Sequence, residues 1–159
     1  MNAELIVNTG PLITLAKIDA LSVIGALPFR FISPTEVLEE LQAGESFGYL
    51  KVAPEWLEIK SLSASVAPMA RAALDLGESA VIQLALEREA RWVCIDEWKA
   101  RRAALSVGLN VVGVLGLLAK AKSTGIIVQV APFVERAVEK GIRYHPDLIR
   151  RVLAAVGEA

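Results

Sequence analysis

One stretch of the sequence limits the possible folds more than any other, because a helical segment separates two short apolar segments. Residues 92–95 read Trp-Val-Cys-Ile, Gly108 is suited to ending a helix, and residues 110–112 read Asn-Val-Val. Two strands joined through a helix pair in parallel, by a right-handed crossover. The stretch therefore predicts a sheet that is at least partly parallel, and so an α/β fold.

The same patterns predict elements along the rest of the chain. Further strands are expected at residues 4–7, 29–32 and 56–62, and further helices at 11–18, 20–26, 34–41, 67–76, 77–89, 115–123, 132–139 and 146–156. Ser33 is expected to cap the helix that starts at Pro34, with Glu36 completing a capping box. The length of 159 residues predicts a single domain, residues 1–159.

Composition excludes several classes of protein. The longest nearly apolar run, residues 111–119, is interrupted by Gly113 and Gly116 and is shorter than the roughly 20 residues that cross a membrane. The start of the chain lacks the features of a signal peptide and the single cysteine excludes an internal disulfide, so a cytoplasmic location is expected. A net charge of −1 gives no global basic field, so any nucleic acid must bind at a local patch or through metal ions.

Oxygen-bearing side chains stand where the predicted elements begin or end. Glu40, Glu78 and Asp96 each lie at or beside such a position, and Asn8 holds a fourth near the start of the chain. In parallel sheets, ligands bind outside the carboxyl ends of the strands. Ligands with oxygen donors only are typical of Mg²⁺ or Mn²⁺ rather than Zn²⁺. The pattern therefore predicts a divalent-metal site built from these four residues.

Each acid also has a purely structural interpretation. On its helix, Glu40 lies closer to the middle of the apolar stripe than Glu36 or Glu39, which favours an inward direction over a solvated rim position. Glu78 can serve as a helix-dipole partner in a first helical turn. Asp96 can act as the N-cap of the helix that follows it. Only the coincidence of all the acids favours the metal site.

Several other side chains are candidates for substrate contacts. Thr9 could place a hydroxyl near the metal or stabilise a turn, and Lys99 and Arg101 could contact phosphates or belong to a solvated helix face. Trp98 could stack on a base, although packing against its neighbours is the commoner role. His145, which precedes a proline, is expected to have a capping or surface role.

A set of short motifs, in order along nearly the whole chain, resembles a known family. The motifs are Ile6-Val7-Asn8-Thr9-Gly10-Pro11-Leu12-Ile13, then Ser33-Pro34 with Glu39-Glu40-Leu41, Gly77-Glu78-Ser79-Ala80, Ile95-Asp96-Glu97 with Ala100-Arg101, and Gly113-Val114-Leu115-Gly116. Together they resemble PIN-domain proteins, the fold of VapC-like toxin ribonucleases, and in particular a compact subgroup of predicted nucleic-acid-binding proteins.

The resemblance implies a three-layer α/β/α fold with a central, mostly parallel sheet and an acidic pocket that binds Mg²⁺ or Mn²⁺. It also implies cleavage of single-stranded RNA and a homodimer held by an antitoxin. The catalytic acids of the family fall on Glu40, Glu78 and Asp96, and the same three residues with Asn8 would hold the metal. Thr9, Lys99 and Arg101 remain candidates for substrate contacts on their own residue types and positions.

Two departures from the family pattern leave more than one hypothesis open. Asn8 stands where the family has its first aspartate, and Val114 stands where a hydroxyl residue is common. The leading hypothesis is a metal-dependent ribonuclease, the toxin of a toxin–antitoxin pair. The alternative is a weak or inactive PIN-like module that binds RNA or protein. A receiver-like domain phosphorylated on Asp96 is disfavoured, because such domains need an acidic pair where this chain has Asn8 and Thr9.

Overall fold

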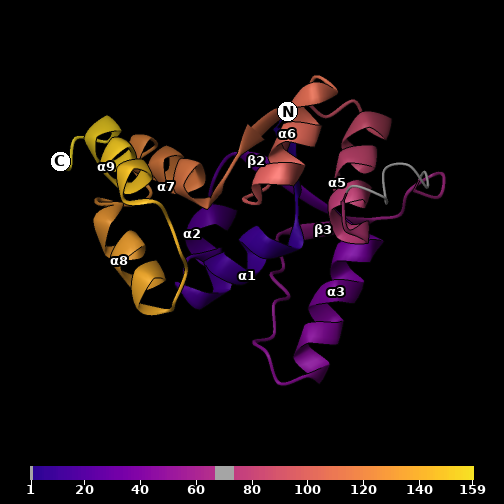
Figure 1. The fold of residues 1–159 in the computed structure, drawn as a ribbon, viewed down its shortest axis with the longest axis horizontal. Coiled ribbons are helices and arrows are strands. Elements are labelled where there is room, and N and C mark those ends of the chain that lie inside the picture. The colour runs from indigo at the N-terminus through magenta and orange to yellow at the C-terminus, as the bar shows by residue number, and fades with distance from the viewer. Residues whose placement is uncertain (1, 67–73) are drawn as a thin grey trace.

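A five-stranded, all-parallel sheet forms the centre of the molecule, as the sequence predicts (Figure 1). The structure is a computed structural model that describes residues 2–66 and 74–159. The strands follow the order β3-β2-β1-β4-β5. Their bounds are β1 Ala3–Val7, β2 Phe29–Pro34, β3 Leu57–Lys60, β4 Trp92–Cys94 and β5 Asn110–Val112. The first strand is therefore central, and its carboxyl end lies beside that of β4.

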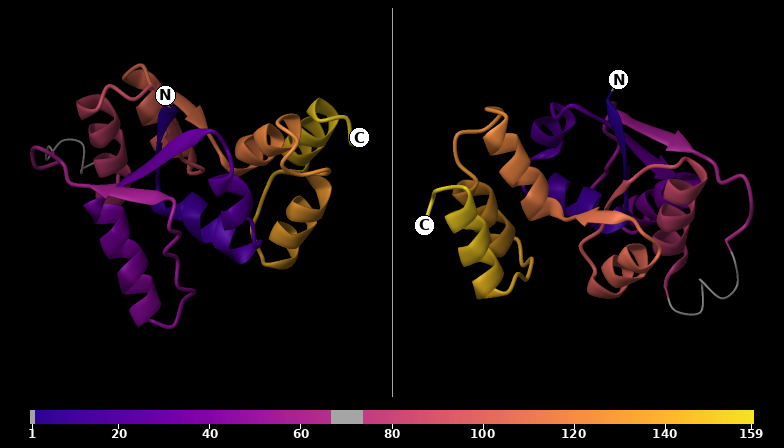
Figure 2. Two further views of the ribbon diagram at one scale, coloured as in Figure 1. Left: turned by 180° about the vertical axis from the view of Figure 1, so that it is seen from behind. Right: turned by 90° about the horizontal axis from the view of Figure 1, so that it is seen from above.

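Helices cover both faces of this sheet and give three α/β/α layers. Helices α1, α2 and α7 contact one another, α5 packs on β1, β2 and β4 and contacts α6, and α3 contacts both α1 and α5. Figure 2 shows α7, α8 and α9 gathered at one end of the molecule, away from α3 and α5. The helices are α1 Thr9–Lys17, α2 Leu21–Gly25, α3 Thr35–Ser46, α5 Leu76–Glu87, α6 Trp98–Ser106, α7 Val114–Ser123, α8 Ala131–Glu139 and α9 Pro146–Ala155. Most of the helix predicted at 67–76 lies outside the described residues.

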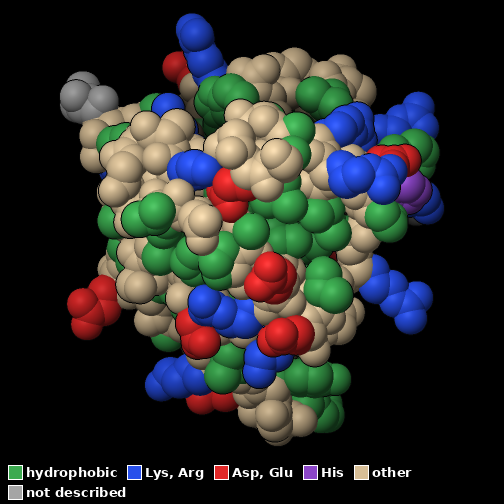
Figure 3. Space-filling model, turned by 90° about the vertical axis from the view of Figure 1, so that its left-hand side faces the viewer, with side chains coloured by type: hydrophobic (Ala, Val, Ile, Leu, Met, Phe, Trp, Pro, Cys, Tyr) green, Lys and Arg blue, Asp and Glu red, His purple; other side chains and the backbone are tan. Residues whose placement is uncertain are grey.

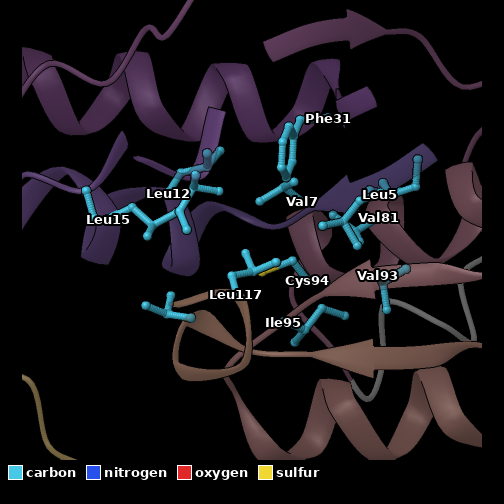
Figure 4. Packing of buried hydrophobic residues seen from close by; sticks show 14 of the residues in the cluster. Leu5, Val7, Leu12, Leu15, Phe31, Val81, Val93, Cys94, Ile95 and Leu117 are labelled. Carbon is cyan, nitrogen blue, oxygen red and sulfur yellow. The ribbon is translucent and has the colours of Figure 1, made fainter. Parts of the chain in front are cut away.

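The hydrophobic core fixes the position of the central strand. Leu5, Ile6 and Val7 are almost fully buried, because helices cover both faces of a parallel sheet. Figure 4 shows Val7 packed among Phe31, Cys94 and other apolar side chains of the same cluster. The residue that follows Val7 is therefore held firmly at the carboxyl edge of the sheet. None of the helices among the described residues is long and apolar enough to cross a membrane.

The prediction that Ser33 caps a helix is wrong. Strand β2 continues to Pro34, which pairs with Lys60 of β3, so α3 begins at Thr35 and Pro34 is its N-cap residue. Ser33 is instead buried in the strand, and its Oγ donates a hydrogen bond of 2.6 Å to the backbone oxygen of Val7. The bond ties the carboxyl ends of β1 and β2 together.

Replacing Ser33 with alanine is expected to lower the free energy of unfolding by about 1–3 kcal/mol, because a buried carbonyl oxygen loses its side-chain donor. Urea denaturation measures the change. Ser46→Ala is the matched control, since the Ser46 hydroxyl donates to Gln42 of its own helix in an exposed position. Equal stabilities of the two variants would contradict a structural role for the Ser33 bond.

Candidate functional site at the carboxyl edge of the sheet

Asn8 occupies the centre of the edge, directly after β1. Its backbone N–H donates to the carbonyl oxygen of Cys94 at 3.0 Å, so it sits beside the end of β4. It is the N-cap residue of α1, but its side chain makes no capping bond. The Asn8 Oδ1 atom is buried and, within the part of the chain that the structure describes, has no hydrogen-bond partner. A buried acceptor left unpaired by the protein is a place where a water or a cation binds.

Glu40 points inward from α3 toward the start of α1. Its Oε2 accepts a hydrogen bond of 2.5 Å from the Thr9 hydroxyl, and the Gly77 N–H donates to the same carboxyl group. A Cβ atom at Gly77 would overlap this carboxylate, so glycine permits the close approach of α3 and α5. Burial raises the pKa of Glu40, although these two hydrogen bonds partly oppose the rise.

Glu78 is buried in the first turn of α5 and takes part in a capping box with Asp75. The Glu78 N–H donates to Asp75 Oδ1 at 2.7 Å, and the Asp75 N–H donates to Glu78 Oε1 at 3.2 Å. Burial raises the pKa of Glu78 to about 7, and the nearby charges of Asp75 and Glu97 act in the same direction. A carboxyl group that titrates near neutrality is typical of a functional site.

Asp96 follows β4 and is not the N-cap of α6, contrary to the sequence-based alternative. That position belongs to Glu97, whose carboxylate accepts from the Ala100 N–H at 2.9 Å. Asp96 lies one residue too early and instead turns toward the next helix, where its Oδ1 accepts from the Val114 N–H at 3.0 Å. A Cβ atom at Gly113 would come within 2.5 Å of this oxygen, so glycine leaves room for the carboxylate.

The charge of Asp96 is balanced from two sides. Burial raises the pKa of the Asp96 carboxyl, while the Val114 N–H and the Arg101 guanidinium oppose the rise. Arg101 is held in place because its Nη1 donates to the backbone oxygen of Ile95 at 2.8 Å. Lys99, two residues before Arg101 on the same helix, is exposed.

The four predicted ligands thus lie along one edge but are held by separate contacts. The Thr9 hydroxyl, directly after Asn8, donates to the Glu40 carboxylate, and the Gly77 N–H, directly before Glu78, donates to the same group. The charge of Glu97, the residue after Asp96, acts on Glu78. Among residues 2–66 and 74–159, no three Asp, Glu, His or Cys side chains are close enough together to hold a metal ion. The donor chemistry nevertheless fits Mg²⁺ or Mn²⁺, because the buried Asn8 oxygen is unpaired and every neighbouring donor is an oxygen.

Two residues of this edge were missed in the sequence. Asp75 stands three positions before Glu78, and this Asp-x-x-Glu spacing is a capping-box signal that could have found it. Tyr144 lies near Asp96, whose charge adds to burial in raising the pKa of the tyrosine hydroxyl well above its usual value. Tyr144 and Asp96 line one cavity from two distant parts of the chain, so no local pattern marks the tyrosine.

The expectation for His145 is confirmed, whereas the expectation for Trp98 is wrong. His145 is the N-cap of α9, where its Nδ1 accepts from the Asp147 N–H at 3.1 Å, and this confirms a capping role. Trp98 was expected to pack against its neighbours, but 64% of its surface is exposed. Arg102 contacts the ring, and its guanidinium carbon lies 4.8 Å from the ring centroid. Most of the indole therefore remains accessible to a ligand.

Comparison with known families accounts for the ordered set of motifs. Residues 4–158 match the family model DUF3368, which is described as a PIN domain. No curated protein matches this sequence. The match reaches from β1, without its first residue, to α9 and includes all four residues predicted to bind metal.

Proposed function

Because the chain belongs to the PIN-domain family, we propose that it is a nuclease that cleaves single-stranded RNA with the help of Mg²⁺ or Mn²⁺. Residues 1–159 would act as one PIN domain. When bound, such an ion polarises a phosphodiester and lowers the pKa of an attacking water. The family supports a nuclease-type domain, and the RNA substrate and the metal are our inference.

The buried, unpaired oxygen of Asn8 is the observation that carries the proposal. It lies at the carboxyl edge of the sheet, where ligands of parallel α/β folds bind. Asn8, Glu78 and Asp96 would hold the metal with Glu40, which Thr9 orients. No three acids among the described residues lie close enough together to hold one ion, so metal binding would have to bring these side chains closer together than the structure has them.

Each carboxyl group would have a distinct part. The Glu40 carboxylate accepts a hydrogen bond from the Thr9 hydroxyl, and this bond fixes the direction of the carboxylate at the edge. The Glu78 carboxyl has a pKa of about 7, so it can accept or release a proton at the pH of the cell. Asp96 stays anionic more readily than burial alone would allow, because of Val114 and Arg101.

The Asn8 amide also supports a second candidate function. Asn8 supplies no formal charge, and the acids are engaged in bonds with the protein itself. These features fit a domain that binds RNA or a protein without cleaving RNA. The two functions differ in turnover, so a cleavage assay with added metal separates them.

Replacing Asn8 with aspartate is expected to tighten Mn²⁺ binding by about tenfold and to raise RNA cleavage, because a hard cation gains a charged ligand. Calorimetry measures the binding, and a labelled single-stranded RNA measures the cleavage. Asn110→Asp, which adds the same charge at the exposed start of β5, is the matched control.

The outcomes of this experiment are distinct. Cleavage by the wild-type chain that EDTA abolishes supports the nuclease. RNA binding without cleavage in either protein, at any Mn²⁺ concentration, favours the non-catalytic module. Failure of both proteins to bind metal or RNA would overturn the proposal.

We also propose that the chain is a cytoplasmic toxin that forms a homodimer covered by an antitoxin. Exposed apolar side chains support such contacts, among them Phe47 at 84% and Tyr49 at 71% exposure beyond α3, and Val128 at 87%. Figure 3 shows hydrophobic side chains gathered across the middle of one face. Sedimentation of the purified chain tests the dimer, because a monomer at all concentrations would contradict it.

A further inference from the structure

A cavity is lined by Asp96 but not by Glu40 or Glu78. It has a volume of about 700 Å³, which is within the usual range of ligand sites. One wall comes from α6 and the loop before α7, and the other from the segment that leads into α9 and from α9 itself. The residues that matter here are Asp96, Trp98, Arg101, Arg143, Tyr144 and Arg151.

The charge that lines this cavity is mainly positive. Arg101, Arg143 and Arg151 face it, and Asp96 is the single acid of the lining. Arg143 and Arg151 are exposed, and no acidic side chain among the described residues pairs with either. Arg150, their neighbour on α9, is by contrast paired with Asp147. Figure 3 shows Lys and Arg side chains gathered around the single histidine, which also lines the cavity.

Two aromatic residues complete the walls. Trp98 exposes most of its indole at the rim, which leaves a ring face free for stacking. The Tyr144 hydroxyl is buried and has no hydrogen-bond partner within residues 2–66 and 74–159. A polar atom of this kind in a ligand-sized cavity is suited to a hydrogen bond with a bound molecule. Guanidinium groups together with an exposed aromatic ring are the features that bind single-stranded nucleic acid.

We propose that this cavity binds the nucleotides on one side of the RNA phosphate that is cleaved. Arg143 and Arg151 contact backbone phosphates, and Trp98 stacks on a base. The strand then passes Asp96 toward the acidic edge. The inference rests on the proposed nuclease function and adds the path of the substrate to it. The C-terminal segment, far from the acids in sequence, thereby becomes a part of the substrate site.

The test measures binding separately from cleavage. Fluorescence anisotropy of a labelled, single-stranded RNA 12-mer is recorded in EDTA for the wild-type chain, for the double variant Arg143→Ala/Arg151→Ala, and for Arg150→Ala. The double variant is expected to bind about tenfold more weakly, with a salt dependence reduced by about two phosphate contacts. Arg150→Ala, whose side chain is paired with Asp147 and does not line the cavity, is expected to bind like the wild type.

A second pair of variants tests the stacking. Trp98→Ala is expected to weaken binding about tenfold. Trp92→Ala, which removes another partly exposed tryptophan outside this cavity, is expected to leave it unchanged. In cleavage assays the arginine variants should raise KM and leave kcat near the wild-type value, as expected for residues that bind substrate without touching the reacting atoms.

The outcomes distinguish this inference from the proposed function. If the wild type binds and cleaves RNA while all these variants match it, the cavity is not the substrate path, and the nuclease proposal stands. If the variants weaken RNA binding but the wild type does not cleave, the cavity is an RNA site and the nuclease proposal falls. Capture of a protein or a peptide by the cavity, with no RNA binding, would overturn both.

Discussion

Asp96→Asn is expected to reduce metal-dependent RNA cleavage by about a hundredfold or more, because it removes a charged ligand of the ion that would polarise the reacting phosphate. The substitution keeps the size of the side chain, and the asparagine oxygen can still accept the Val114 N–H. It also removes the cost of burying a charge, which raises the pKa of Asp96 in the wild type. The variant should therefore be at least as stable as the wild type.

The combination of lost activity and retained stability separates a functional role from a structural one. Cleavage of single-stranded RNA in Mn²⁺ gives the activity, and thermal denaturation gives the stability. Asp19→Asn is the matched control, because the Asp19 side chain is 83% exposed at the end of α1. An Asp96→Asn variant that cleaves RNA as fast as this control would rule out Asp96 as a catalytic residue.

The parallel sheet could be predicted because its signals are local. Short apolar segments separated by helix starts and stops define β4, α6 and β5, and their order dictates the crossover. The residues at which strands and helices begin and end were harder to predict. Strand β2 extends to Pro34 because β3 pairs with it, and that pairing joins residues that are distant in sequence. Ser33 therefore had the pattern of a cap but the position of a buried strand residue.

The candidate site could be predicted only in part, for the same reason. Position at the end of a strand identified Asn8 and Asp96, since that feature is visible in the sequence. The direction of the Asp96 side chain could not be predicted, because its hydrogen-bond partner Val114 is 18 residues away in the sequence. Tyr144, Arg143 and Arg151 come from a C-terminal segment that lines a cavity with Asp96 only after folding. Chemistry could thus be inferred from residue types, whereas its geometry depends on tertiary contacts.

The second large effect is expected at Glu78, in the pH dependence of the free energy of unfolding. Its pKa is about 7 in the folded chain against an ordinary value of 4.5, mainly because of burial. Between these two values the folded state binds more protons than the unfolded state, so stability falls as pH rises. Above pH 7 the full cost applies, and a shift of this size corresponds to about 3 kcal/mol.

Replacing Glu78 with glutamine should remove this loss of stability at high pH. Glutamine retains an oxygen that can accept the Asp75 N–H, so the capping box survives without a titrating group. We expect the variant and the wild type to have similar stability at pH 4.5, and the variant to be more stable by up to about 3 kcal/mol at pH 8. Urea denaturation in EDTA at the two pH values measures the difference.

Glu87→Gln on the same helix provides a control of opposite sign. The Ser63 N–H donates to the Glu87 carboxylate and lowers its pKa, so the wild type should keep a small advantage over this variant at pH 8. Loss of a negative charge alone would shift both variants in the same direction. If Glu78→Gln follows the pH profile of the wild type, Glu78 is not the buried, neutral-range acid that its surroundings indicate. Its proposed part in proton transfer would then have no physical basis.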